Sequence, residues 1–404
     1  MTRPLEGLRV LDLSRILAAP FATQLLGDMG ADVIKVERPR VGDDARQYGP
    51  PFLDEPGGGD SLESGFYLSA NRNKRSITID HSSPDGADLI RELAAVSDVL
   101  VENYRAGVLD KYGLGYHALH PLNPRLVYCS VTGFGQDGPY AARAGYDGVF
   151  QAMSGMMSVS GVPDGQPGAG PMKVGVSMVD ILAGLYASSA ILAALRDRDM
   201  VSGRGQFIDL SLLDCGVAAL SHYAQNYLVS GQAAPRRGNG GFGGIPSQAF
   251  RCADADIFVV ASTAGQWSAL AGALERPELA DDPRFATVSA RIANRDLVLE
   301  TLESIFANQP AAHWIAALEG ADVPVSPVNS MDAVFDNPQI RHRGMRVAVD
   351  HPTAGSVDLI ANPIDPTTTY AAPPLLGEHT DEILTQVLGR TADEVAALRE
   401  SGAI

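Results

Sequence analysis

Asp180 stands out among the residues of this chain that could do chemistry. It is the only charged residue between positions 174 and 195, in the segment VGVSMVDILAGLYASSAILAAL. An ionised carboxylate in so apolar a segment is costly unless it caps a helix or takes part in a reaction. Both interpretations stay open, because a carboxylate at the start of a helix over residues 181–195 could cap that helix and also act as a nucleophile.

Composition limits the possible partners. The chain has 31 basic and 48 acidic residues, a net charge of −17, which opposes binding to nucleic acid or to an anionic membrane. Cys129, Cys215 and Cys252 are odd in number and far apart, so neither a disulfide framework nor a metal site is expected, and a reducing cytoplasm fits best. The N-terminus lacks the apolar core of a signal peptide, and the apolar run 181–195 is too short to span a bilayer. We expect a soluble protein.

The first third of the chain alternates between strand-like and helix-like segments. We predict strands over residues 8–13, 32–37, 76–80, 98–102 and 126–131, and helices over 18–29 and from Pro84 onward, with Ser83 as N-cap. This alternation predicts a mainly parallel sheet covered by helices, in a Rossmann-like α/β domain. The turn after the first strand, SRILAAP, lacks the glycine fingerprint of a dinucleotide site.

The composition changes near residue 225. Residues 230–244, SGQAAPRRGNGGFGG, are typical of a linker or of a mobile active-site loop. Beyond them, residues 249–261 predict a pair of strands and residues 267–318 are mostly helical. We therefore predict a large domain over 1–225, a smaller α+β domain over 226–330, and a return segment over 331–404 that completes the large domain.

Four segments in this order along the chain indicate a family: PLEGLRVLDLSRILAAPFATQLLGDMGADVIKVERP, DVLVENYRAGVLDKYGL, GYDGVFQAMSG and PLLGEHTDEIL. Together they resemble the family III CoA-transferases, or CaiB/BaiF family, which includes formyl-CoA and carnitine CoA-transferases and 2-methylacyl-CoA racemases. The resemblance covers essentially the whole chain. It implies an intertwined homodimer, in which each subunit is threaded through a ring made by the other.

By this resemblance, Asp180 is the catalytic aspartate of a CoA-transferase. Its carboxylate would attack the thioester of an acyl-CoA donor, giving an acyl-aspartyl anhydride and then an aspartyl-CoA thioester, from which an acceptor acid takes CoA. Succinyl-CoA as donor and a small carboxylic or dicarboxylic acid as acceptor are the expected substrates. CoA thioesters enter only as substrates, so no permanently bound cofactor is expected.

The resemblance also assigns residues to CoA binding. They are Leu17, Ala18, Arg38, Ile79, Ser82, Asn103, Tyr104, Arg105, Lys111, Tyr146 and Asp147. Two positions depart from the family pattern. Lys111 stands where relatives commonly have an arginine, and His81-Ser82 stands where they often have a lysine. A lysine binds phosphate as a point charge but lacks the bidentate fork of arginine.

Tyr146 bears on the choice between transferase and racemase. Racemases of the family have a histidine at the position of Tyr146, in the middle of the Gly-x-Asp segment, because inverting an α-carbon needs a second acid/base. Tyrosine is a poor base at neutral pH. A transferase is favoured over a 2-methylacyl-CoA racemase or a noncatalytic CoA-binding protein. Tyr146 could equally be a packing residue.

The glycine-rich stretch has two interpretations as well. Some transferases close a glycine loop over the aspartyl intermediate to exclude water, and Gly240, Gly241, Gly243 and Gly244 would form that lid. The sequence GNGGFGG differs from the glycine tetrad of formyl-CoA transferases, so oxalate is not assured as acceptor. A plain linker is the alternative.

Overall fold

The computed structural model describes residues 3–54, 60–241, 243–364 and 369–404, and it divides into two compact units. The first unit contains Met1–Met157, Lys173–Ala233 and Pro338–Ile404, and the second contains Ser158–Met172 and Ala234–Asn337. The predicted boundaries after 225 and 330 fall near two of these transitions. The excursion Ser158–Met172 has no counterpart in the predicted domains.

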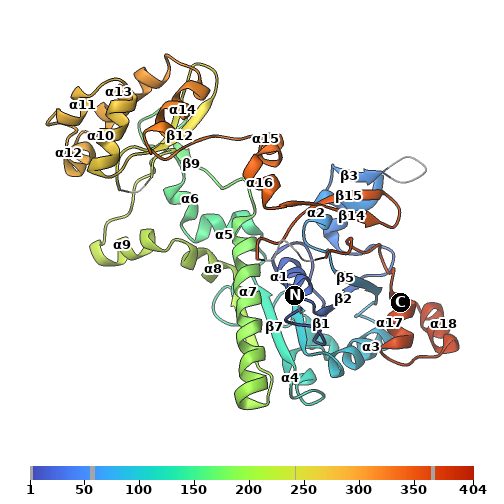
Figure 1. The fold of residues 1–404 in the computed structure, drawn as a ribbon. Coiled ribbons are helices and arrows are strands. Elements are labelled where there is room, and N and C mark those ends of the chain that lie inside the picture. Colours follow the sequence, from blue (N-terminus) through green and yellow to red (C-terminus); the bar gives the residue numbers. More distant parts are fainter. Residues whose placement is uncertain (1–2, 55–59, 242, 365–368) are drawn as a thin grey trace. The chain divides into compact units, whose positions relative to one another are not determined.

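A six-stranded parallel sheet forms the centre of the first unit, in the order β10-β7-β6-β1-β2-β5 (Figure 1). The strands are β1 (Arg9–Asp12), β2 (Asp32–Glu37), β5 (Lys74–Thr78), β6 (Val99–Glu102), β7 (Val127–Thr132) and β10 (Phe207–Ser211). The five predicted strands are confirmed to within two residues, and the mixed α/β class with a parallel sheet is confirmed. β10 is a strand that the sequence pattern did not predict.

Alternate residues of the strands pack against helices on the two faces of the sheet. Val10 and its neighbours on one face join the core formed with α1 (Ala18–Asp28), α7 (Met178–Asp197) and α8 (Leu212–Ala219). Leu11 and its neighbours on the other face join the core formed with α3 (Pro84–Ala95), α4 (Tyr116–Leu119), α17 (Thr380–Gln386) and α18 (Ala392–Glu400). This period of two is what a sheet buried on both sides requires.

The long helix α7 packs closely on α1. A Cβ atom added to Gly184 would lie 2.6 Å from the carbonyl oxygen of Ala18, so this crossing requires a glycine. The helix is longer than the predicted run 181–195, because it begins at Met178 and continues through η3 (Arg198–Ser202). Within the described part of the chain it is the one helix whose length and composition would allow it to cross a membrane, a test that core helices of soluble proteins also pass.

The other elements of the first unit are short. They are η1 (Asp44–Gln47), β3 (Phe52–Asp54), β4 (Asp60–Ser64), α2 (Gly65–Leu68), η2 (Leu109–Tyr112), α5 (Asp147–Met153), α9 (His222–Ser230), α16 (Pro338–His342), β14 (Arg346–His351) and β15 (Gly355–Ile360). The predicted cap of α3 is confirmed, because the hydroxyl of Ser83 accepts a hydrogen bond from the amide of Gly86. α6 (Met156–Val159) spans the transition to the second unit.

The second unit has its own antiparallel sheet and apolar core. Its elements are β8 (Gly161–Val162), β9 (Gly170–Pro171), β11 (Ser247–Arg251), β12 (Asp256–Val260), α10 (Ala264–Ala273), α11 (Glu278–Asp281), α12 (Val288–Ala293), α13 (Arg295–Phe306), α14 (Ala311–Gly320), β13 (Val325–Pro327) and α15 (Met331–Asp336). The strands pair in the order β11-β12-β13. The predicted strand pair and the helical stretch after it are confirmed.

Candidate active site

Asp180 is the third residue of α7, not the residue that caps it. The helix begins at Met178, and Ser177 at the N-cap position makes no side-chain capping bond. The capping interpretation of Asp180 is therefore wrong. The cap comes from another element: the Oδ1 atom of Asp147, at the start of α5, accepts hydrogen bonds from the amides of Val179 at 2.8 Å and of Asp180 at 3.3 Å.

Asp147 is itself held in place from its other oxygen. The side-chain amide of Gln151, one turn further along α5, donates to Asp147 Oδ2 at 2.6 Å, and Gln151 Oε1 accepts from the amide of Val174 at 2.8 Å. Asp147 is buried, whereas the residue Asp180 as a whole is half-buried. One carboxylate thus serves the structure of the helix start, and the neighbouring one is left available for chemistry.

The electrostatic surroundings of Asp180 oppose its ionisation. Burial, with a further contribution from the negative charge of Asp147, raises its pKa to about 7. Within the described residues no cation forms an ion pair with it. A carboxylate with such a pKa is a stronger base and nucleophile than one at the ordinary value, yet a large fraction of it is ionised at neutral pH.

Asp180 opens onto a cleft of about 220 Å³ in the first unit. The wall residues come mainly from the turn after β1, the start of α1, the ends of β6 and β7, and the loop before α5. They include Arg15, Ile16, Leu17, Ala18, Asp44, Asn103, Tyr104, Arg105, Thr132, Gly133, Arg143, Gly145, Tyr146, Phe150 and Leu212. The β1, β6 and β7 segments leave the sheet at their carboxyl ends, where ligands bind in open α/β sheets.

Phe150 and two glycines shape the floor of this cleft. The ring of Phe150 is 1% exposed, and a Cβ atom at Gly145 or Gly133 would lie 2.4 Å or 2.7 Å from it. The loops on both sides of the ring can approach it only because these two residues have no side chain. Gly145 therefore belongs to the geometry of the cleft, which places Tyr146, 68% exposed, on its wall and not in the core.

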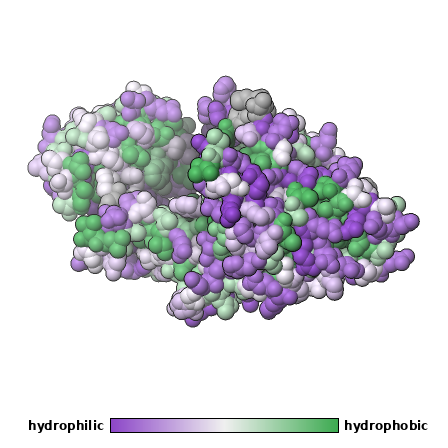
Figure 2. All heavy atoms as spheres, turned by 90° about the horizontal axis from the view of Figure 1, so that it is seen from below, coloured by the Kyte–Doolittle hydropathy of each residue, from purple (hydrophilic) through white to green (hydrophobic). Residues whose placement is uncertain are grey.

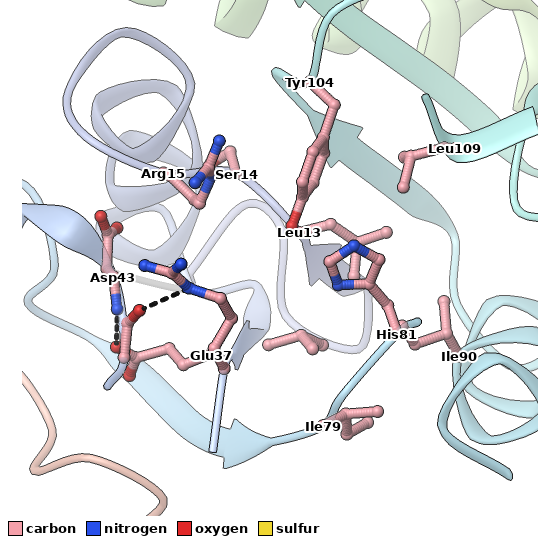
Figure 3. Close-up of a pocket in the computed structure, with 13 residues that line it drawn as sticks. Leu13, Ser14, Arg15, Glu37, Asp43, Ile79, His81, Ile90, Tyr104 and Leu109 are labelled. Atoms are coloured by element: carbon pink, nitrogen blue, oxygen red, sulfur yellow. Dashed lines mark hydrogen bonds between the residues drawn. The ribbon is translucent and has the colours of Figure 1, made fainter. Parts of the chain in front are cut away.

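A second, narrow pocket shares Arg15 and Tyr104 with the Asp180 cleft. Figure 3 shows the side chains of His81 and Tyr104 lying side by side in it, with ring centroids 5.2 Å apart. Ile79, Ile90, Leu13 and Leu109 line it as well. Burial lowers the pKa of His81, so this aromatic and aliphatic pocket suits a flat, uncharged ring.

Two arginines stand at the edge of this second pocket. Arg15 donates to Asp44 at 2.8 Å and lies over the Tyr104 ring at 5.0 Å, and Arg38 forms an ion pair with the same carboxylate. Both guanidinium groups remain about one-third exposed or more, which leaves donors free for an anion. An arginine at the rim of an aromatic pocket can donate two parallel hydrogen bonds to a phosphate group.

A buried ion pair holds the turn after β1, whose residues line both cavities. Lys35 Nζ, fully buried, donates to Asp43 at 2.8 Å and to the carbonyl of Ser14 at 3.0 Å. The other oxygen of Asp43 accepts from the amide of Ile16, whose φ of 71° is unusual for a β-branched residue. The pair thereby fixes the strained turn that leads into Leu17 and α1.

The structure brings most of the predicted CoA-binding residues to these two cavities. Leu17, Ala18, Asn103, Tyr104, Arg105 and Tyr146 line the Asp180 cleft, and Arg38, Ile79 and Tyr104 line the second pocket. Three do not line either one: Ser82, which hydrogen-bonds to Asp80, the exposed Lys111, and Asp147, which caps α7.

The glycines of the predicted lid belong to the second unit. A Cβ atom at Gly241 or Gly244 would lie 2.9 Å from Ser247 Oγ or 2.3 Å from Ser262 Cβ, so tight packing within that unit explains both residues. Gly240 lies against Arg295 in the same way, and Gly243 has a φ of 100° with open space around it. Residue 242 lies outside the described residues.

Sequence reasoning missed Arg15, Asp44 and Arg143, all of which line the Asp180 cleft. Arg15 lies two residues after the predicted strand 8–13, in the same turn as Leu17 and Ala18, and a basic side chain at the end of a strand is a useful signal for an anion site. Arg143 had no comparable signal, because it lies in a loop of irregular sequence.

The fold and the site define an α/β protein in which a half-buried carboxylate faces a cleft beside an aromatic pocket. The sequence profile of CoA-transferase family III matches residues 5–380, and the chain belongs to this family. It is 42% identical to human succinyl-CoA:glutarate CoA-transferase over 100% of this chain and 90% of that protein. It is 43% identical to the succinate–glutarate CoA-transferase of Agrobacterium fabrum, over 96% of this chain and 97% of that one.

A solved structure has the same fold. The crystal structure of a CaiB/BaiF family protein from Brucella suis aligns with a TM-score of 0.85 at 41% identity, covering 96% of this chain and 100% of that one. The resemblance inferred from the sequence is thus confirmed, and the chain is an enzyme of the CoA-transferase type.

Proposed function

We propose that this enzyme transfers CoA from succinyl-CoA to a short dicarboxylic acid such as glutarate, with Asp180 as the covalent nucleophile. The observation that carries the proposal is Asp180 itself: a carboxylate without a cation partner among the described residues, with a pKa of about 7, facing a cleft that adjoins an aromatic pocket with arginines at its rim. The names of the relatives support the choice of acids.

The chemistry proceeds through two exchanges at one carboxyl group. An Asp180 oxygen attacks the thioester carbonyl, the C–S bond breaks, and CoA leaves as the thiolate with its electron pair, giving an acyl-aspartyl anhydride. The thiolate then attacks the Asp180 carbonyl carbon, the anhydride C–O bond breaks, and the donor acid leaves as a carboxylate. The acceptor carboxylate repeats both steps in reverse, so no net proton or water is consumed.

The remaining residues position the substrate. His81, Ile79 and Tyr104 would receive the adenine ring, Arg38 and Arg15 the phosphates, and Leu17, Ala18, Asn103 and Arg105 the pantetheine arm along the cleft. CoA esters are substrates in this scheme and no cofactor stays bound. Three buried free cysteines support a reducing, cytoplasmic location.

The family includes racemases, but among the described residues no histidine lines the cleft with Asp180, which argues against that activity. Tyr146 occupies the wall position instead. A pure 2-methylacyl-CoA epimer in deuterated water should therefore show little exchange at the α-carbon. Rapid exchange with loss of chirality would favour the racemase.

We further propose an intertwined homodimer. The first unit exposes large apolar side chains on α7, α8 and α9, including Tyr186, Val217, Leu228 and Val229, the last two more than 70% exposed. Figure 2 shows one face of the molecule, where hydrophobic groups interrupt the hydrophilic surface. Light scattering after gel filtration should give a dimer, and a folded monomer would rule out this arrangement.

The transfer activity is tested with Asp180→Ala. Wild-type protein mixed with succinyl-CoA and glutarate should yield glutaryl-CoA, detected by mass spectrometry, and the variant should lose at least a thousandfold in rate, about 4 kcal/mol of transition-state stabilisation. Binding of CoA, measured by calorimetry, should remain. Near-normal turnover in the variant would remove Asp180 from the mechanism.

A further inference from the structure

Three arginines line the Asp180 cleft, and they differ in what else they do. Arg15 is paired with Asp44 and also lines the second pocket. Arg105 also faces a third cavity, whose walls include the carboxylates of Glu102 and Asp110. Arg143 lines the Asp180 cleft alone among these three cavities, and it forms no ion pair with any residue that the structure describes.

The guanidinium group of Arg143 has an aromatic neighbour and no acidic one among the described residues. It lies 3.8 Å from the centroid of the Tyr140 ring, and the backbone amide of Arg143 donates to the carbonyl of Tyr140 at 2.8 Å. Tyr140 packs edge-on against Phe134 at 5.7 Å, and Phe134 against the buried Phe150 at 5.3 Å. A cation over an aromatic face keeps its N–H donors at the edge, where they can bind a carboxylate.

The loop that contains Arg143 is also tied to the nucleophile. Four residues after Arg143, Asp147 accepts hydrogen bonds from the amides of Val179 and Asp180. Four residues of extended chain span at most about 14 Å. The backbone at Arg143 therefore lies within this distance of the residue that caps α7, and the exposed Arg143 side chain lines the same cleft as Asp180.

We infer that Arg143 binds the free carboxylate of a dicarboxylic acyl group while the other end of that group reacts at Asp180. The inference rests on the proposed function and adds to it the residue that selects acids with a second carboxylate. Without a cation, the free carboxylate of such an acyl group would be repelled by the net negative charge of the protein and by the charge of Asp180. An unpaired guanidinium at the far end of the acyl group offsets this repulsion and favours diacids over monoacids of equal length.

The test compares two acceptors that differ only in the second carboxylate. With succinyl-CoA as donor, kcat/KM is measured for glutarate and for pentanoate in the wild type, Arg143→Gln, Arg143→Lys and the control Arg204→Gln. Arg204 is an exposed arginine of the same unit that does not line the cleft.

Arg143→Gln should lower kcat/KM for glutarate about 30-fold, the effect of losing charge-assisted hydrogen bonds, and should narrow the preference for glutarate over pentanoate by the same factor. Arg143→Lys should keep part of the preference for glutarate, and Arg204→Gln should change neither kcat/KM for glutarate nor that preference. If Arg143→Gln kept the wild-type preference for glutarate over pentanoate, or lost kcat/KM equally for both acids, the role of Arg143 would be overturned. The proposed CoA-transferase function would still stand in that case. If the wild type transferred CoA to no acid in a panel, the proposed function would fall and this inference with it.

Discussion

Three carboxylates at or near the second pocket and the carboxylate of Asp180 in the neighbouring cleft have pKa values that shift in opposite directions. Burial alone would raise the pKa of Asp12, Glu37 and Asp43, but each contacts a buried cation, and each ends below its usual range. Asp180 faces no such cation within the described residues, and burial raises its pKa to about 7. Paired carboxylates fix the walls, and the unpaired one is left reactive.

The cations of the first group show how complete the pairing is. Lys74 contacts Asp12 at 3.0 Å, Lys35 contacts Asp43 at 2.8 Å, and Arg46 contacts Glu37 at 2.7 Å, all six side chains being almost fully buried. The comparison teaches that burial by itself does not make a carboxylate reactive. What matters is whether a cation is buried with it.

The largest stability effect should come from breaking one of these pairs. Lys35→Met leaves Asp43 buried without its cation, and we expect the free energy of unfolding to fall by about 3–5 kcal/mol at pH 7. The pKa of Asp43 would then rise above its value in the unfolded chain. The ionised carboxylate would therefore lower the free energy of unfolding of the variant above pH 4, whereas below pH 4 the protonated group would not. Urea unfolding at pH 7 and pH 4 measures this difference.

The control for that variant is Arg125→Met, which removes an exposed pair with Asp199. It should change the free energy of unfolding by less than about 1 kcal/mol. A loss in Lys35→Met no larger than this, or one equal at both pH values, would contradict the assigned role of the buried pair.

The opposite change should follow from removing the unpaired charge. Asp180 has a pKa raised above its unfolded value, so its ionised form costs stability above pH 4, and this cost grows until about pH 7. Asp180→Asn should therefore be more stable than the wild type at pH 8 by about 1–2 kcal/mol, because the group is partly exposed, and no more stable at pH 4. Thermal unfolding at the two pH values tests this, with the exposed Asp393→Asn as control; a loss of stability at pH 8 would count against an unpaired charge.

The smallest effect concerns the neighbour of Asp180. Asp147→Asn keeps an oxygen for the amides at the start of α7 but removes the negative charge, so the pKa of Asp180 should fall. In the wild type, kcat/KM should rise with pH with a midpoint at about pH 7. In Asp147→Asn this midpoint should move to a lower pH by about half a pH unit. Asp147→Ala, which also removes the cap, should lower the rate at every pH. An unmoved profile in the asparagine variant would mean that Asp147 does not influence the nucleophile.

Much of the fold follows from local pattern. The strands over 9–12 and 32–37 and the cap at Ser83 could be predicted because hydrophobic period and capping preference act between near neighbours. The strand β10 could not, because its pattern is short and it reaches the edge of the sheet only after the long excursion through α7.

The site was harder to predict. Asp180 could be found from composition alone, but its true relation to the helix could not, because the cap comes from Asp147, thirty-three residues earlier. The charge state of Asp180 likewise depends on which cations are absent from its surroundings in the folded chain. Arg143 could not be predicted for a similar reason, since its place on the cleft wall depends on its contact with Tyr140, which packs edge-on against Phe134 in the folded chain.

The most direct test of the account is to find CoA on Asp180. Wild-type protein incubated with succinyl-CoA in the absence of an acceptor, then digested quickly under acidic conditions, should contain a peptide heavier by one CoA minus one water. Fragmentation should place that mass on Asp180, glutarate should remove it, and Asp180→Asn should show none. An adduct on another residue, or rapid transfer without any covalent adduct, would contradict Asp180 as the nucleophile.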